Sequence, residues 1–88
     1  MKLIIAIIQD QDTEPVSRAL TSMSFRVTLV ASTGGFLRKG SSTLLIGVED
    51  HQVEQALQIL RETCSLSNDP NQKRATIFVL NVQKTAYL

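Results

Sequence analysis

Apolar and polar positions recur along the chain with two different periods, and each period predicts a different kind of element. Four segments rich in β-branched and other apolar residues have a period of two, which predicts β-strands over residues 2–9, 25–33, 43–49 and 75–82. Two other segments carry apolar residues at i, i+3, i+4 and i+7, the spacing of one helix face. These positions are Val16, Ala19, Leu20 and Met23 in the first helix and Val53, Ala56, Leu57, Leu60 and Cys64 in the second. The predicted order is βαββαβ.

Polar residues before each helical stripe predict where the helices begin. Asp12 or Thr13 can cap the first helix, and Pro15 is tolerated in its first turn. Asp50 can cap the second helix. The sequence SNDPNQ lies within residues 65–74, which are therefore predicted to form a loop.

The order of elements predicts an α+β domain of the ferredoxin-like plan, with two helices on one face of a four-stranded antiparallel sheet. This plan leaves the second sheet face without a helix. Residues 3–8 are nevertheless apolar on both alternating faces, and the last strand offers Phe78, Leu80 and Val82 on one face. Because a bare apolar face of this size exceeds what soluble monomers usually expose, we expect other copies of the chain to cover it.

Length and composition indicate one small domain over residues 1–88. Of these residues 43% are hydrophobic, and a chain of this size buries roughly 60–65% of its unfolded surface, which is only just enough for a stable core. The single cysteine, Cys64, cannot form an internal disulfide, and the apolar run at residues 3–8 is too short for a signal peptide. No run approaches the ~20 apolar residues of a membrane span. We therefore expect a cytoplasmic protein that does not insert into membranes.

The formal net charge of +1 hides an uneven distribution of charge. Residues 15–48 contain four cations, Arg18, Arg26, Arg38 and Lys39, and no acidic residue. The rest of the chain contains five cations and eight acidic residues. The basic stretch is therefore a candidate to bind an anionic ligand.

The sequence TGGFLRKGSS joins two predicted strands but contains more than a connector needs. Glycines such as Gly35 let a ligand approach the backbone closely and leave N–H groups available to an anion. Phe36 offers a flat face on which a base can stack, and the two cations that follow can attract phosphate. Alternatively, Phe36 and Leu37 pack on a neighbouring subunit, and both interpretations fit the sequence.

Two polar residues share one face of the second predicted strand. Arg26 and Thr28 alternate away from the apolar Phe25 and Val27. If this face meets another subunit, a cation and a hydroxyl lie in a crevice and require a polar ligand; if it does not, they are solvated residues of an edge strand. Gly47, on the following strand, leaves room for a ligand in the same crevice.

The remaining candidates for chemistry are weaker. Asp10 and Asp12 can hold a divalent cation, but an acidic pair before a helix is far more often a turn and a cap. His51 has no second ligand at metal-binding spacing. Cys64 lacks the partners of a nucleophile, so we expect the Cys64 side chain to be buried. The sequence contains no GxxxxGK(S/T), GxSxG or HExxH pattern, and residues 2–9 lack the aromatic residues of an RNA-binding sheet. We predict no enzyme activity, no bound metal, no resident cofactor and no nucleic-acid polymer as a partner.

Three segments together resemble a known family. MKLIIAIIQDQD, FRVTLVASTGGFLRKGSSTLLIGVED and ATIFVLNV are similar to the PII-like cyclic di-AMP receptors, signalling proteins related in fold to the nitrogen regulatory PII proteins. The resemblance implies a homotrimer of ferredoxin-like subunits with one cyclic di-AMP in each of three clefts between subunits. It also implies an output by loop rearrangement, without chemistry, that is read by an unknown downstream protein.

The resemblance further implies roles for residues chosen above. Arg26 and Thr28 are implied to lie near ribose and phosphate, while Gly47 is implied to let the ligand approach the backbone closely. Phe36 and Leu37 are implied to contact an adenine, and Phe78 to form a second aromatic wall. The full set of expected ligand-binding residues is Arg26, Thr28, Gly35, Phe36, Leu37, Ser41, Gly47 and Phe78.

The chain departs from the family at several places. Ser24 and Ser41 replace asparagines, Tyr87 stands where a glutamine is expected, and the long Gly/Pro-rich loop before the last strand shrinks to SLSNDPNQKR. A serine keeps one hydrogen-bond donor but loses the paired donor and acceptor of an amide. A PII-like trimer that senses another nucleotide or a small anion, and a ligand-free protein-interaction trimer, are therefore the alternatives to a cyclic di-AMP receptor.

Overall fold

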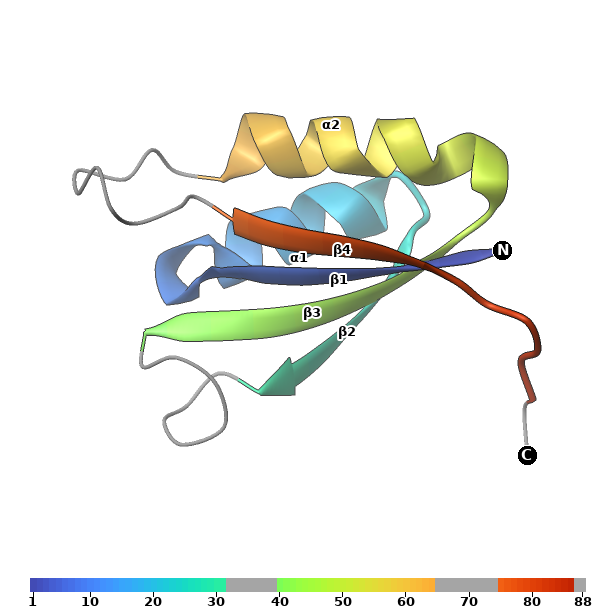
Figure 1. Ribbon diagram of the computed structural model, residues 1–88. Coiled ribbons are helices and arrows are strands. Elements are labelled where there is room, and N and C mark those ends of the chain that lie inside the picture. The colour runs from blue at the N-terminus through green and yellow to red at the C-terminus, as the bar shows by residue number, and fades with distance from the viewer. Residues whose placement is uncertain (32–39, 65–74, 87–88) are drawn as a thin grey trace.

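The computed structural model describes residues 1–31, 40–64 and 75–86. Its elements follow the predicted βαββαβ order (Figure 1). The strands are β1 (Lys2–Gln9), β2 (Arg26–Ala31), β3 (Ser41–Val48) and β4 (Ala75–Asn81), and the helices are α1 (Thr13–Ser22) and α2 (Val53–Thr63). A 3-10 turn precedes each helix, η1 (Asp10–Asp12) before α1 and η2 (Asp50–Gln52) before α2. None of the helices in these residues is long and apolar enough to cross a membrane.

The four strands form one antiparallel sheet in the order β2-β3-β1-β4, and both helices lie on the same face of it (Figure 1). β1 lies in the interior of the sheet, where it pairs with β3 on one side and β4 on the other. Its residues Ile4, Ala6 and Ile8 face the helices and are buried, whereas Leu3, Ile5 and Ile7 lie on the opposite face, which no described element covers. The prediction of a four-stranded antiparallel sheet with two helices on one face is confirmed.

The core lies between the sheet and the two helices. The central strands contribute every second residue, which gives the buried set Ile4, Ala6, Ile8, Leu44, Ile46 and Val48. The helices contribute Val16 and Leu20 from α1 and Ala56 and Leu60 from α2, each at most 1% exposed. Each aliphatic side chain buried in this way stabilises the fold by roughly 1.5–3 kcal/mol relative to exposure. Cys64 is also buried, as predicted.

The end of α1 differs from the predicted stripe. Met23 is expected in the core, but the helix ends before it and its side chain is 50% exposed. The N–H of Ser24, at φ 69°, donates to the carbonyl of Thr21. The N–H of Phe25 donates to the carbonyl of Leu20, and the two bonds together form a Schellman motif. This motif turns the chain so that Phe25, 5% exposed, enters the core instead of Met23.

The starts of the two helices are predicted with different success. Asp12, one of the two predicted caps, occupies the N-cap position of α1, but its side chain makes no capping hydrogen bond. The prediction that Asp50 caps α2 is wrong, because the turn η2 separates Asp50 from the helix. The N–H of Glu49 donates to Gln52 Oε1 (2.9 Å) across that turn, and the Asp50 carboxylate instead lies 3.1 Å from the α-amino group of Met1.

The strand bounds differ slightly from those predicted. β1 has the predicted bounds, whereas β2 starts one residue later than expected and β4 ends one residue earlier. β3 starts at Ser41, two residues before the predicted start, and ends at Val48. The predicted continuation of the second strand to residue 33 and the predicted loop at residues 65–74 lie outside the described residues.

Candidate functional site

The face of the sheet turned away from α1 and α2, called the open face below, carries alternate residues of all four strands. These residues are Leu3, Ile5, Ile7 and Gln9 from β1, Arg26 and Thr28 from β2, Ser41, Thr43, Leu45 and Gly47 from β3, and Thr76, Phe78 and Leu80 from β4. Phe78 is 50% exposed and Leu80 is 45% exposed. The open face is therefore largely apolar, no described element covers it, and polar residues lie along β2 and at one end of β1 and β3.

The structure brings three expected ligand-binding residues together on β2 and β3. Arg26 lies directly opposite Gly47, and Thr28 lies opposite Leu45, the next open-face residue of β3. Both Arg26 and Thr28 are exposed. A Cβ atom added to Gly47 would lie 3.4 Å from Cε of Met1, so the glycine leaves a space beside a flexible side chain. The crevice residues predicted from the sequence are thus neighbours in one chain.

Phe78 lies at the other edge of the sheet. One row of paired residues crosses all four strands, from Thr28 through Leu45 and Ile5 to Phe78. Three strand spacings of about 4.8 Å separate Thr28 from Phe78 by about 14 Å. Within one chain these two side chains do not border the same crevice. A shared cleft requires that β4 of one copy approaches β2 of another.

Gly35, Phe36 and Leu37 lie outside the described residues, but the chain that leads into β3 after them is described. Gly40 has φ +84°, a conformation that glycine adopts without strain. Its carbonyl accepts the N–H of Asp10 (2.9 Å). This bond fixes the backbone immediately before Ser41 against the junction of β1 and α1.

Side chains strengthen the same junction. Ser42 Oγ donates to Asp10 Oδ1 (2.5 Å), and Thr13 Oγ1 donates to Ser42 Oγ (2.7 Å). Ser42 is 1% exposed, so this chain of bonds ties β1, α1 and β3 together in a buried position. Asp10, a candidate cation ligand in the sequence, serves here as a hydrogen-bond acceptor. Within residues 1–31, 40–64 and 75–86 no group of three His, Cys, Asp or Glu side chains could hold a metal ion.

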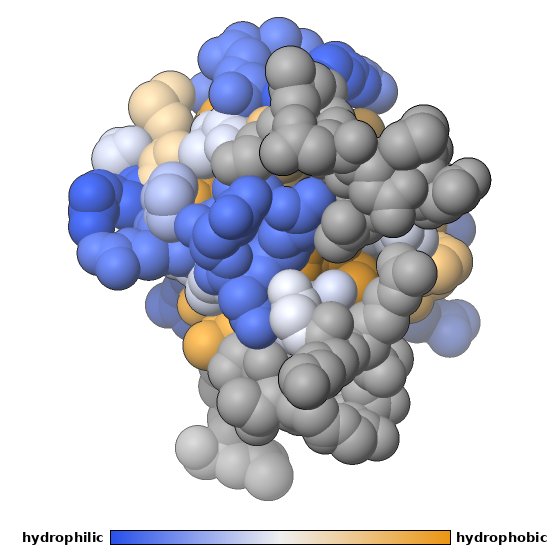
Figure 2. Space-filling model, turned by 90° about the vertical axis from the view of Figure 1, so that its left-hand side faces the viewer, coloured by the Kyte–Doolittle hydropathy of each residue, from blue (hydrophilic) through white to orange (hydrophobic). Residues whose placement is uncertain are grey.

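The end of the molecule that contains this junction is shown in Figure 2. Hydrophilic residues cover much of its described surface, and apolar surface is visible between them. Two open-face side chains at this end carry buried polar atoms for which the described residues offer no hydrogen-bond partner, Gln9 Nε2 and Thr43 Oγ1. Neither residue was predicted as a site residue from the sequence. The available signal was the period of two, because both residues stand at positions that alternate with core residues.

Charged groups lie close together at the other end of β1, beside Met1. A hydrogen bond from the α-amino group of Met1 lowers the pKa of Asp50, and the positive charge of Lys2 lowers it further. Lys2 Nζ also donates to Asn81 Oδ1, and the Met1 carbonyl accepts the N–H of Val82 (3.1 Å). These contacts hold the first residues of the chain against the end of β4.

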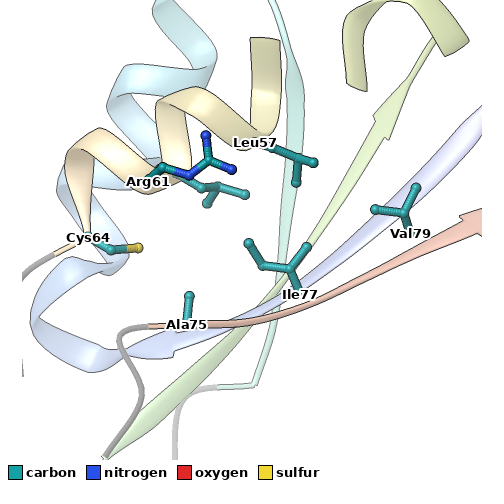
Figure 3. A pocket seen from close by; sticks show the side chains of 7 residues that line it. Leu57, Arg61, Cys64, Ala75, Ile77 and Val79 are labelled. Carbon is teal, nitrogen blue, oxygen red and sulfur yellow. The ribbon is translucent and has the colours of Figure 1, made fainter. Parts of the chain in front are cut away.

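A cavity of about 350 Å³ lies on the other side of the sheet, between α2 and β4 (Figure 3). Its lining is mainly apolar and consists of Leu57, Leu60, Arg61, Cys64, Ala75, Ile77 and Val79. Arg61 Nη1 donates to Gln58 Oε1 (2.7 Å). None of the expected ligand-binding residues in the described part of the chain lines this cavity, and its walls suit an apolar group better than a nucleotide.

Comparison with known proteins agrees with the resemblance seen in the sequence. A family model described as cyclic-di-AMP receptor matches residues 1–71. This range includes β1, β2, β3 and both helices but not Phe78. A crystal structure of a functionally unknown protein from Pediococcus pentosaceus ATCC 25745 is similar to the whole chain, with a TM-score of 0.78 and 32% sequence identity. The match covers 99% of this chain and 96% of that protein.

Proposed function

The chain belongs to the cyclic di-AMP receptor family, whose members are non-enzymatic signalling proteins, and we propose that it binds cyclic di-AMP in clefts between the subunits of a homotrimer. The bound nucleotide changes the conformation of the loops around the cleft, and a downstream protein reads that change. The protein acts in the cytoplasm. It needs no metal and no resident cofactor for this role.

The open face carries this proposal. Leu3, Ile5 and Ile7 on β1 continue into the half-exposed Phe78 and Leu80 on β4, so one chain alone leaves a wide apolar surface in water. Burying this surface against other copies stabilises the assembly. β2 and β4 form opposite edges of the sheet, so a ring of copies can bring the Phe78 edge of one subunit near the Arg26 edge of the next.

The polar residues of β2 fit an anionic nucleotide. Arg26 is the one charged residue that the four strands contribute to the open face. Its guanidinium can donate two parallel hydrogen bonds to one phosphate, and Thr28 can donate to a second oxygen or to a ribose. The missing side chain at Gly47, directly opposite Arg26, leaves room for the sugar-phosphate backbone.

The remaining contacts follow from the family. Phe36 and Leu37 contact an adenine, Gly35 allows the ligand to approach the backbone, and Ser41 donates one hydrogen bond. Phe78 of the neighbouring subunit forms the second aromatic wall. The bonds from Asp10 to Gly40 and Ser42 support this arrangement, because they hold the chain beside Ser41 in one position.

Isothermal titration calorimetry with cyclic di-AMP tests the proposal. The wild-type protein should bind one nucleotide per chain, and Arg26→Ala should weaken binding at least 10-fold, because a charge-assisted hydrogen bond contributes about 1.5–3 kcal/mol. Arg18→Ala is the matched control, since Arg18 is an exposed cation that pairs with Glu14 on α1. An intact trimer that gives no heat with cyclic di-AMP would reject the proposal.

The shortened segment SLSNDPNQKR favours one alternative, a trimer of the same architecture that senses another nucleotide or a small anion. A thermal-shift panel of ATP, other cyclic dinucleotides and small anions separates the two. If Phe36→Ala dissociates the trimer and no ligand raises the melting temperature, the protein is instead a ligand-free interaction trimer.

A further inference from the structure

The open face contains two polar atoms that the described residues leave unsatisfied. Gln9 Nε2 and Thr43 Oγ1 are both buried, and no hydrogen-bond partner for either atom lies within residues 1–31, 40–64 and 75–86. Thr43 is 6% exposed, so solvent does not replace the missing partner. Leaving a buried donor or acceptor unpaired destabilises the folded state, and folded proteins contain few such groups. Their presence on one face of one chain needs an explanation.

The two side chains extend the polar border that starts at Arg26. The open-face residues of β3 are, in order, Gly47, Leu45, Thr43 and Ser41. On β2, Arg26 pairs with Gly47 and Thr28 pairs with Leu45. On β1, Gln9 pairs with Ser41 at the far end of this row. Successive open-face positions of a strand are about 7 Å apart. Hydrogen-bonding side chains therefore occur at steps of about 7 Å over a length of about 20 Å. An elongated ligand bound at Arg26 and Thr28 extends along this line toward Thr43 and Gln9.

The chemistry of the two ends differs. Arg26 provides the positive charge at one end, whereas the strands place no charged side chain on the open face beside Thr43 and Gln9. Among the described residues a phosphate at that end would find no counter-ion, and it would lose its hydration there. A nucleobase is neutral and presents ring nitrogens and amino groups on its edge. The Gln9 end therefore suits a base.

The hydrogen bonding of the Gln9 amide indicates which base can bind there. Gln11 Nε2 donates to Gln9 Oε1 (2.9 Å) in an exposed side-chain pair, and this bond leaves the second lone pair of the oxygen for another donor. A glutamine amide pairs with adenine by donating to a ring nitrogen and accepting from the amino group. Guanine presents a carbonyl where adenine presents that amino group. The Thr43 hydroxyl can donate or accept.

We propose that Gln9 and Thr43 are specificity-determining residues that read an adenine edge of the bound cyclic dinucleotide. This inference rests on the proposed function and adds to it the residues that select the base. The bound ligand then supplies the hydrogen-bond partners of Gln9 Nε2 and Thr43 Oγ1, and the ligand-free protein is less stable because these atoms are unpaired.

Two substitutions test the inference by opposite effects on binding and on stability. Thr43→Val keeps the shape of the side chain and removes the unpaired hydroxyl. It should raise the melting temperature of the ligand-free protein by a few degrees and weaken cyclic di-AMP binding 5- to 30-fold in calorimetry. Gln9→Ala should weaken binding by a similar factor. A purely structural role of Thr43 would not raise stability while lowering affinity.

The chain offers a matched control for each variant. Thr21 is exposed on α1 and Gln55 is exposed on α2, so both lie away from the open face, and Thr21→Val and Gln55→Ala should change the affinity less than 2-fold. In ¹⁵N-labelled protein, the side-chain amide signals that Gln9→Ala removes should shift when cyclic di-AMP is added.

The possible results distinguish a failure of the roles proposed for Gln9 and Thr43 from a failure of the proposed function. If the wild-type trimer binds cyclic di-AMP but Gln9→Ala and Thr43→Val bind as well as their controls, the inference is wrong and the proposed function stands. If the Gln9 amide signals do not move on saturation with the nucleotide, the inference is also wrong. If the wild-type protein gives no heat at all, the proposed function itself fails.

Discussion

At the scale of single residues, Ser24 shows what hydrophobic periodicity misses. It adopts φ 69°, a conformation that costs roughly 1–2 kcal/mol for most L-residues but is accessible to glycine and asparagine. The backbone alone therefore favours the asparagine found at this place in the family. The spacing of apolar residues in a helix contains no information on the sign of φ. The sequence pattern therefore predicted that Met23 is buried, whereas Met23 is half exposed and Phe25 is buried.

Replacing Ser24 by glycine should stabilise the protein. Ser24→Gly removes the Cβ that the left-handed conformation disfavours, so the free energy of unfolding should rise by about 1 kcal/mol in urea denaturation. Ser17→Gly is the control of opposite sign, because Ser17 lies inside α1 and glycine there should lower stability by about 0.5 kcal/mol. A loss of stability in both variants would contradict the turn described at Ser24.

The ion pair of Asp50 predicts a pH dependence. The pKa of Asp50 is lowered in the folded chain, chiefly by the hydrogen bond from the α-amino group of Met1. Its contribution is therefore present above the unfolded carboxyl pKa of about 4 and is lost as the pH falls through the lower folded value. Thermal melts from pH 7 to pH 2 should show wild type more stable than Asp50→Asn at neutral pH only. A pH-independent difference would count against the ion pair.

At the scale of elements, the sequence predicts most of the fold because each element has a distinct apolar pattern. β1, both helices and β4 were found from period and composition, with ends correct to within one or two residues. The start of β3 was predicted two residues too late, because polar contacts determine it: Ser41 pairs with Gln9, and Ser42 donates to Asp10. Strand order and register depend on pairing between distant segments, which the pattern of a single segment does not contain.

The observed end of α1 gives a prediction that separates two positions of one predicted stripe. Leu20 is fully buried, so Leu20→Ala should lower the free energy of unfolding by about 3 kcal/mol. Met23 is half exposed, so Met23→Ala should cost less than about 0.5 kcal/mol. Equal losses in denaturant titrations would mean that the stripe continues to Met23.

At the scale of the whole molecule, the open face links the fold to the proposed site. Its apolar character was predicted from the two-sided pattern of β1 and the composition of β4, and the described residues bear this out. The geometry of the site was not predictable to the same depth. The distance of about 14 Å between Thr28 and Phe78 follows from strand order, and it makes the proposed cleft depend on two copies of the chain.

A charge on the open face should therefore prevent assembly. Leu80→Glu places a carboxylate in the proposed contact between copies and should convert the proposed trimer to monomers in light scattering coupled to gel filtration. Met23→Glu is the control, since Met23 is an equally exposed apolar residue outside the four strands, and it should leave the trimer intact. A trimer that survives Leu80→Glu would move the interface to another surface.

A crystal structure with cyclic di-AMP locates the ligand and the assembly in one experiment. We expect a trimer with one nucleotide in each cleft, with a phosphate at Arg26 and Thr28 of one subunit and Phe78 of the neighbouring subunit against the ligand. Nucleotide bound away from the open face, such as in the cavity between α2 and β4, would contradict this expectation.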